Sequence, residues 1–277
     1  MPRLQQMKLP VSATILALLL LSSCGHTPDR ALPDRSLSPT TDAGVVNVAI
    51  KVPTELEAMD MRVIYRSKTC TFTDYTASGI PYDRDGYQQM DLKPIQQEQS
   101  RIFEAKVPVN GGGSCNWTLS NVTFGAKYKD TSAFGEGIGS GLPAGMIVIF
   151  DDNNSPNGRW DIKADGDLTV VRDYYPWLSE RFLGGHTRSM SLITNGYFYL
   201  IYKAPDARNV HFEPILHSQF LTRSVGPKVK AKGNRTIYYY PDGSNSFEAY
   251  SWPNHAKLQA IRMAAEARRQ ALSDSEG

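Results

Sequence analysis

The feature that most constrains the fold of this chain is a long succession of short segments rich in β-branched and aromatic residues. The first is the run from Val45 to Val52, which reads Val-Val-Asn-Val-Ala-Ile-Lys-Val. Similar segments follow at Met61 to Arg66, Ile102 to Val109, Trp117 to Tyr128, Met146 to Phe150, Leu168 to Arg172 and Tyr197 to Tyr202. Such runs favour β-strands, and their close spacing leaves little room for helices. The sequence therefore predicts a mainly β fold of one or two antiparallel β-sandwich-like domains.

The C-terminal part of the chain adds a hairpin and a helix to this prediction. The segments Thr236 to Tyr240 and Ser246 to Ser251 flank Pro-Asp-Gly-Ser-Asn, whose proline fixes a negative φ and whose glycine accepts a positive one. After Pro253, one helical stripe contains Leu258, Ile261, Ala265 and Leu272. This pattern predicts a C-terminal amphipathic helix with a frayed tail over 253–277, covering one end of the β domain. A membrane or a partner is the alternative surface for it.

The length of the folded region accommodates one large β domain or two smaller ones. A weak boundary lies at Asp151 to Gly158, which consists of turn-forming residues throughout. We therefore expect a β domain over 45–150 and a second β region over 151–252.

The N-terminus is typical of a secreted lipoprotein. Lys8 and an apolar run from Val11 to Leu21 precede the sequence Leu-Ser-Ser-Cys24. The run is shorter than the roughly 20 residues that span a bilayer, as in a secretory signal. It resembles the lipobox of bacterial lipoproteins, which implies a signal peptide over 1–23 and a lipid on Cys24. The alternative is an ordinary secretory signal with a chance cysteine. Residues 24–44 are rich in Pro, Ser, Thr and Asp, which predicts a flexible tether.

Charge and cysteine content narrow the class of partner and the compartment. Removal of residues 1–23 takes away two basic residues and no acid, which leaves 28 basic and 28 acidic residues. A neutral chain argues against a nucleic-acid partner and against tight electrostatic binding to anionic lipid. Once Cys24 is set aside, Cys70 and Cys115 remain, and in an oxidising compartment we expect them to form a disulfide.

Metal binding and catalysis are weakly indicated. Oxygen ligands crowd one neighbourhood at Asp151, Asp152, Asn153, Asp161, Asp165 and Asp167. The spacing does not fit an EF-hand, so we expect a solvated turn and no metal, with calcium as the alternative. Neither a GxSxG nor an HExxH motif is present. We expect no enzyme activity and no cofactor; the alternative is a site formed by His211, Glu213 and His217.

Aromatic residues near predicted turns and edges suggest a protein-binding surface. The sequence Tyr-Tyr-Pro-Trp at 174–177 and the run Tyr238 to Tyr240 bring together large amphipathic side chains that serve as binding anchors or as core. The sequence leaves these two alternatives open. The candidate partner contacts are Asp151, Asp152, Asp161, Asp165, Tyr174 and Trp177.

One further segment carries a family resemblance. The segment Gly-Ser-Cys-Asn-Trp-Thr-Leu-Ser-Asn-Val at 113–122, together with the lipobox and the β-rich composition, resembles the periplasmic immunity lipoproteins that protect bacteria from type VI secretion lipase effectors. The resemblance implies a non-enzymatic protein that binds a toxic phospholipase. Gly25 follows the cysteine, where lipoproteins retained in the inner membrane tend to have aspartate, which implies the periplasmic face of the outer membrane. The alternative is an accessory lipoprotein of cell-envelope assembly or surface structure.

Overall fold

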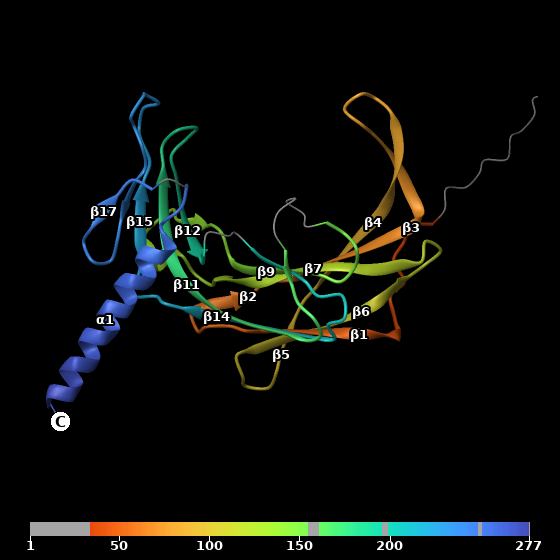
Figure 1. The fold of residues 1–277 in the computed structure, drawn as a ribbon, viewed down its shortest axis with the longest axis horizontal. Coiled ribbons are helices and arrows are strands. Elements are labelled where there is room, and N and C mark those ends of the chain that lie inside the picture. The colour runs from red at the N-terminus through yellow and green to blue at the C-terminus, as the bar shows by residue number, and fades with distance from the viewer. Residues whose placement is uncertain (1–33, 155–160, 196–198, 249–250, 277) are drawn as a thin grey trace, which may run out of the picture. The chain divides into compact units, whose positions relative to one another are not determined.

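The fold is mainly β, as the sequence predicts (Figure 1). The computed structural model describes residues 34–154, 161–195, 199–248 and 251–276. Arg35–Gly277 forms one compact unit, and its main hydrophobic core draws residues from both sides of Asp151.

The elements follow one another in a nearly unbroken series of strands. The strands are β1 (Thr40–Lys51), β2 (Leu56–Ala58), β3 (Met61–Tyr75), β4 (Pro81–Leu92), β5 (Ile95–Gln96), β6 (Ile102–Gly112), β7 (Trp117–Tyr128), β8 (Gly139–Ser140), β9 (Ala144–Ile149), β10 (Ile162–Lys163), β11 (Leu168–Arg181), β12 (Thr187–Ile193), β13 (Leu200–Lys203), β14 (Asn209–Leu216), β15 (Thr222–Val225), β16 (Ile237–Tyr239) and β17 (Asn245–Ser246). A short 3-10 helix, η1 (Ser132–Phe134), and the C-terminal helix α1 (His255–Glu276) complete them.

Two layers of strands enclose the main core. Pairing joins β5, β6, β1, β14 and the first half of β11 in one layer, and β4, β3, β7, β9, β13 and β10 in the other. The β6–β7 hairpin links the layers. Between them, the rings of Phe124 and Phe212 meet edge to face with centroids 6.1 Å apart. Side chains from both layers are buried in this space, which makes it the main core.

Parallel pairs interrupt the expected antiparallel pattern. β1 pairs in parallel with β14, β11 with β14, and β9 with β13. Each of these pairs joins segments that are distant in sequence, because a parallel connection must return to the same end of the sheet. The fold is thus a mixed sheet system in which antiparallel pairs predominate.

A smaller sheet continues from the second half of β11. There β11 pairs with β12 on one side and β15 on the other, and the order of strands is β8, β12, β11, β15, β16, β17. The predicted hairpin near the C-terminus is confirmed, because Tyr238 pairs with Ser246 and the Tyr240 N–H donates to the Ser244 carbonyl at 2.8 Å. Gly243 in the turn has a φ of +83°, as expected for glycine at such a position.

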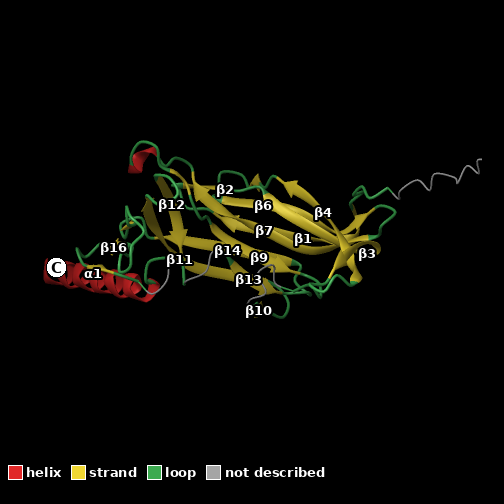
Figure 2. Ribbon diagram, turned by 90° about the horizontal axis from the view of Figure 1, so that it is seen from above, coloured by secondary structure: helices red, strands yellow, loops and turns green. Residues whose placement is uncertain are grey.

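Helix α1 packs on this smaller sheet through its N-terminal half (Figure 2). Leu258 is fully buried, and Ile261 and Ala265 pack beside it on a second core of aromatic side chains. The predicted amphipathic helix is confirmed, but Leu272 on the same stripe is exposed. Asn254 caps the helix by accepting a hydrogen bond from the Lys257 N–H at 3.1 Å.

The folded body begins earlier than expected. β1 starts at Thr40, Leu37 packs against the main core, and the Ser38 N–H donates to the Gly111 carbonyl at 2.9 Å. The expectation of a flexible tether up to residue 44 is therefore wrong for 37–44, because these residues gain backbone and apolar contacts. The expected signal peptide over 1–23 and Cys24 lie outside the described residues. Among the helices that the structure describes, none has the length and apolar character needed to cross a membrane.

Candidate functional site

The β3–β4 hairpin leaves the sheet and becomes a two-stranded ribbon, residues 67–86. β3 pairs with β7 only up to Arg66, opposite Thr118. The pairing of β3 with β4 then shifts register, so that Lys68 to Thr71 lie opposite Asp85 alone, and continues to Tyr75. A bulge of this kind bends the strand and turns the ribbon away from the sheet (Figure 1).

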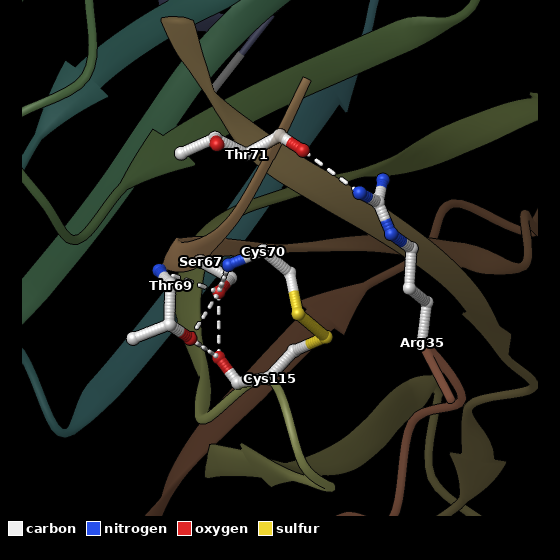
Figure 3. The surroundings of a disulfide bond; sticks show 6 residues. All are labelled: Arg35, Ser67, Thr69, Cys70, Thr71 and Cys115. Carbon is white, nitrogen blue, oxygen red and sulfur yellow. Dashed lines mark hydrogen bonds between the residues drawn. A yellow bond between two sulfur atoms is a disulfide. The ribbon is translucent and has the colours of Figure 1, made fainter. Parts of the chain in front are cut away.

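A disulfide braces the base of the ribbon. Cys70 of β3 is bonded to Cys115, which precedes β7, and the Cα atoms are 5.3 Å apart, so the predicted pairing is confirmed. The Ser67 and Thr69 hydroxyls both donate to the Cys115 carbonyl, at 2.5 and 2.7 Å (Figure 3). Arg35 donates to the Thr71 carbonyl at 2.8 Å from the N-terminal side. An isolated hairpin is marginally stable in water, so these contacts hold the ribbon in place.

Close backbone packing also fixes the base. At Gly86 of β4, a Cβ atom would lie 1.9 Å from the Cys70 carbonyl oxygen and 3.3 Å from the indole of Trp117. Only glycine allows β4 to pass so near the backbone that carries the disulfide. Trp117 is fully buried beneath this crossing.

Ion pairs join the ribbon to the loop after β9. Arg66 donates to Asp85 at 2.6 Å, to Asp151 at 2.8 Å and to Asp152 at 3.1 Å. Burial alone would lower the pKa of Arg66, but the hydrogen bonds and charges of these three carboxylates raise it above its usual value. Lys68 and Arg66 in turn lower the pKa of Asp152. Asp151 and Asp152 thus serve to position the ribbon.

The tip of the ribbon, residues 75–82, has a composition typical of an interface centre. It reads Tyr-Thr-Ala-Ser-Gly-Ile-Pro-Tyr and contains no charged residue. Tyr75, Ile80 and Tyr82 are 64, 61 and 43% exposed, and Tyr87, directly after the ribbon, is 60% exposed. Large aromatic and aliphatic side chains with few charges characterise the buried centre of protein interfaces.

Hydrogen bonds within the tip keep these side chains in one arrangement. The Thr76 N–H donates to the Ile80 carbonyl at 2.9 Å, and the Gly79 N–H donates to the Thr76 carbonyl at 2.8 Å. The Thr76 hydroxyl accepts from the Ile80 N–H at 3.0 Å. An ordered tip loses less conformational entropy when it binds.

Comparisons of the chain with protein-family models, with curated proteins and with solved structures found no match. The function is therefore inferred from the geometry of the ribbon and of the surfaces around it.

Two of the residues expected to contact a partner are core residues instead. Tyr174 and Trp177 are 1% and 8% exposed. Tyr174 packs against Phe212 in the main core, and the Trp177 indole donates to the Ser224 hydroxyl at 2.8 Å in the second core. The expectation of partner contacts at these positions is wrong, because alternate residues of β11 face the two cores.

The remaining acidic residues do not form one cluster. Asp161 and Asp165 flank β10, while Asp167 accepts hydrogen bonds from the Arg208 and Asn209 N–H groups at 2.9 and 2.8 Å. In the part of the chain that the structure describes, no three His, Cys, Asp or Glu side chains gather as a metal site requires.

The three residues considered as an enzyme site, His211, Glu213 and His217, contact separate partners. Glu213 pairs with Lys51 at 2.7 Å. His217 contacts Asp173 at 2.7 Å and stacks on Tyr175 at 5.1 Å. His211 lies on β14 opposite Ala49 and Thr169.

Helix α1 docks over part of this region. Arg262 donates to the Tyr175 hydroxyl at 3.0 Å and to Asp173 at 3.3 Å. His255 meets the edge of the Tyr175 ring at 5.5 Å, and its Nε2 has no hydrogen-bond partner among the described residues. Burial lowers the pKa of His255 below its usual value of 6.5. The negative charge of Asp173 opposes this shift, and the positive charge of Arg262 adds to it.

Acidification should therefore lower the stability of the fold, because His255 becomes protonated more readily in the unfolded chain. The unfolded chain binds a proton here below about pH 6.5, whereas the folded chain resists it, so stability falls as pH falls through that value. We expect the thermal midpoint to decrease between pH 7.5 and 5.5, and to decrease less in His255→Gln, which cannot be protonated. An equal decrease in both proteins would assign the acid sensitivity to other groups.

Proposed function

We propose that the chain is a non-catalytic binding protein and that the tip of the ribbon is its contact surface for a protein partner. The observation that carries this proposal is the uncharged, exposed tip on a braced base. Three large side chains, Tyr75, Ile80 and Tyr82, remain exposed to water, while the base is held by a disulfide, a close backbone crossing and ion pairs. Such a combination suits recognition, because aromatic anchors presented rigidly contribute most to binding free energy.

The partner class we propose comes from the resemblance of residues 113–122. It is a secreted antibacterial effector of the lipase class, which the chain would neutralise at the periplasmic face of the outer membrane, anchored through a lipid on Cys24. The segment that carries the resemblance includes Cys115 and Trp117, which form the base of the ribbon. The alternative is an accessory lipoprotein of envelope assembly, which would use the same tip on another protein.

Substitutions in the tip should weaken binding without affecting the fold. The partner is first isolated on the immobilised full chain from proteins of the source bacterium, then purified and titrated directly. We expect Ile80→Ser and Tyr82→Ser each to cost about 2 kcal/mol, roughly thirtyfold in Kd. Ile95→Ser and Tyr239→Ser are matched controls, because Ile95 and Tyr239 are also exposed, at 71 and 43%, and lie outside the ribbon.

The outcome separates the two partner classes. A captured phospholipase whose activity falls on addition of the wild-type chain, but not of Ile80→Ser, would support the immunity function. A captured envelope component would support the alternative. Partner binding that is equal for the tip variants and their controls would contradict the assignment of the tip.

A further inference from the structure

Two loops lie side by side at one end of the strands of the smaller sheet (Figure 1). One joins β11 to β12 and the other joins β15 to β16. β11 and β15 are parallel neighbours up to the pair Glu180 and Val225, and the Gly226 N–H donates to the Glu180 carbonyl at 2.8 Å. The Lys228 ammonium lies 5.4 Å from the ring centroid of Phe182, and this cation–π contact joins the two loops. We call residues 181–188 and 223–235 together the cationic face.

Basic side chains dominate this face. The exposed cations are Arg181, Arg223, Lys228, Lys230, Lys232 and Arg235. Two acids border the face. Glu180 is mostly covered and bonded to Arg223 at 2.9 Å and to His186 at 3.1 Å, and Glu136 lines a pocket with His186 and Arg188. Arg181, Lys230, Lys232 and Arg235 form no ion pair with any described residue. The face therefore has uncompensated positive charge although the chain as a whole is nearly neutral.

Aliphatic side chains project from the same loops. Leu183 is 47% exposed beside Gly184 and Gly185, and Val229 is 64% exposed between Lys228 and Lys230. An exposed aliphatic residue flanked by lysines suits the boundary between lipid headgroups and acyl chains, where cations meet phosphate and apolar side chains leave water.

We propose that the cationic face docks on a bilayer of anionic phospholipid. The lysines contact headgroup phosphates, and Leu183 and Val229 insert below them. A protein with acidic residues would satisfy the charge, but the centre of a protein interface is a continuous apolar patch with few charges, whereas Val229 here lies between two lysines. This surface is separate from the ribbon, so the proposal does not depend on the function assigned to the tip.

The first test measures the charge dependence of vesicle binding. Full-length chain is floated with vesicles of phosphatidylcholine alone, or of phosphatidylcholine and phosphatidylglycerol mixed at about 3 to 1. The partition coefficient for the anionic vesicles is divided by that for the neutral vesicles, and this ratio is compared between wild type and variants. This ratio isolates the headgroup charge from binding by the apolar N-terminal segment. We expect K228Q/K230Q/K232Q to lower the ratio roughly a hundredfold, at about fivefold per lysine. The control K93Q/K106Q/K163Q removes three exposed lysines elsewhere and should leave it unchanged.

The second test measures insertion. We expect Leu183→Ser/Val229→Ser to lower binding to the anionic vesicles about tenfold, since both side chains would leave the acyl boundary. Circular dichroism and thermal melting verify that each variant is folded. Three outcomes would overturn the proposal. They are equal partitioning of the wild-type chain to both vesicle types, a lysine triple variant that behaves like its control, and full binding by the serine double variant. Preference for polyglutamate over anionic vesicles would also overturn it and assign the face to an acidic protein.

Discussion

Replacing Cys70 and Cys115 together with serine should lower the free energy of unfolding by about 4 kcal/mol. The disulfide closes a loop with a sequence separation of 45 residues. In the chain-entropy model, a cross-link of this span removes about 4 kcal/mol of conformational freedom from the unfolded chain. The loss is measured by denaturant unfolding of wild type and variant under oxidising conditions.

The position of the bond adds a local effect to the global one. Because the disulfide lies at the base of the ribbon, its removal should expose 67–86 to limited proteolysis before the rest of the chain unfolds. Wild type treated with a reductant is the control and should reproduce the behaviour of the variant. Unchanged unfolding and an uncut ribbon in the double variant would show that the disulfide makes no contribution to stability.

Gly86→Ala should be nearly as damaging, with a loss of about 3 kcal/mol in unfolding free energy. The added Cβ would lie 1.9 Å from the Cys70 carbonyl oxygen, and backbone cannot move aside as a flexible side chain can. Either β4 moves away from the disulfide or Trp117 loses its packing. Denaturant unfolding and near-UV circular dichroism of the buried indole measure both consequences.

Gly139→Ala is the matched control for this substitution. Gly139 also lies in a strand, but its nearest contact would be the Arg188 carbonyl at 3.7 Å, so the methyl group fits. We expect that variant to unfold like wild type. In the background without the disulfide, Gly86→Ala should cost less, because the Cys70 backbone, no longer bonded to Cys115, is then able to move away from β4. Equal effects of Gly86→Ala and Gly139→Ala would contradict the close crossing.

Local sequence signals predicted the parts of the fold that depend on near neighbours. The β-branched run from Val45 to Val52 predicted a strand, and the turn after Tyr240 predicted its hairpin. The parallel pairs of β1 and β11 with β14 were not predictable in this way, because no turn joins such strands and their register depends on distant residues.

The candidate site was harder to predict than the fold. Beyond Arg66 the ribbon contains charges, threonines and Gly79, so its strands lack the apolar runs that mark a sheet. The aromatic residues at 174–177 fit either a partner surface or the core, and they are core residues because β11 is covered on both faces there. A usable signal for the tip was Gly-Ile-Pro between Tyr75 and Tyr82, a turn flanked by apolar residues without charge.

The tip of the ribbon lies outside both hydrophobic cores. Its residues are held by hydrogen bonds within the loop itself and by the base beneath it. Changes of sequence there consequently leave the packing of the body untouched. The body is in this sense a constant scaffold carrying an exchangeable eight-residue loop. If the tip binds a partner as proposed, its specificity can change without loss of foldability.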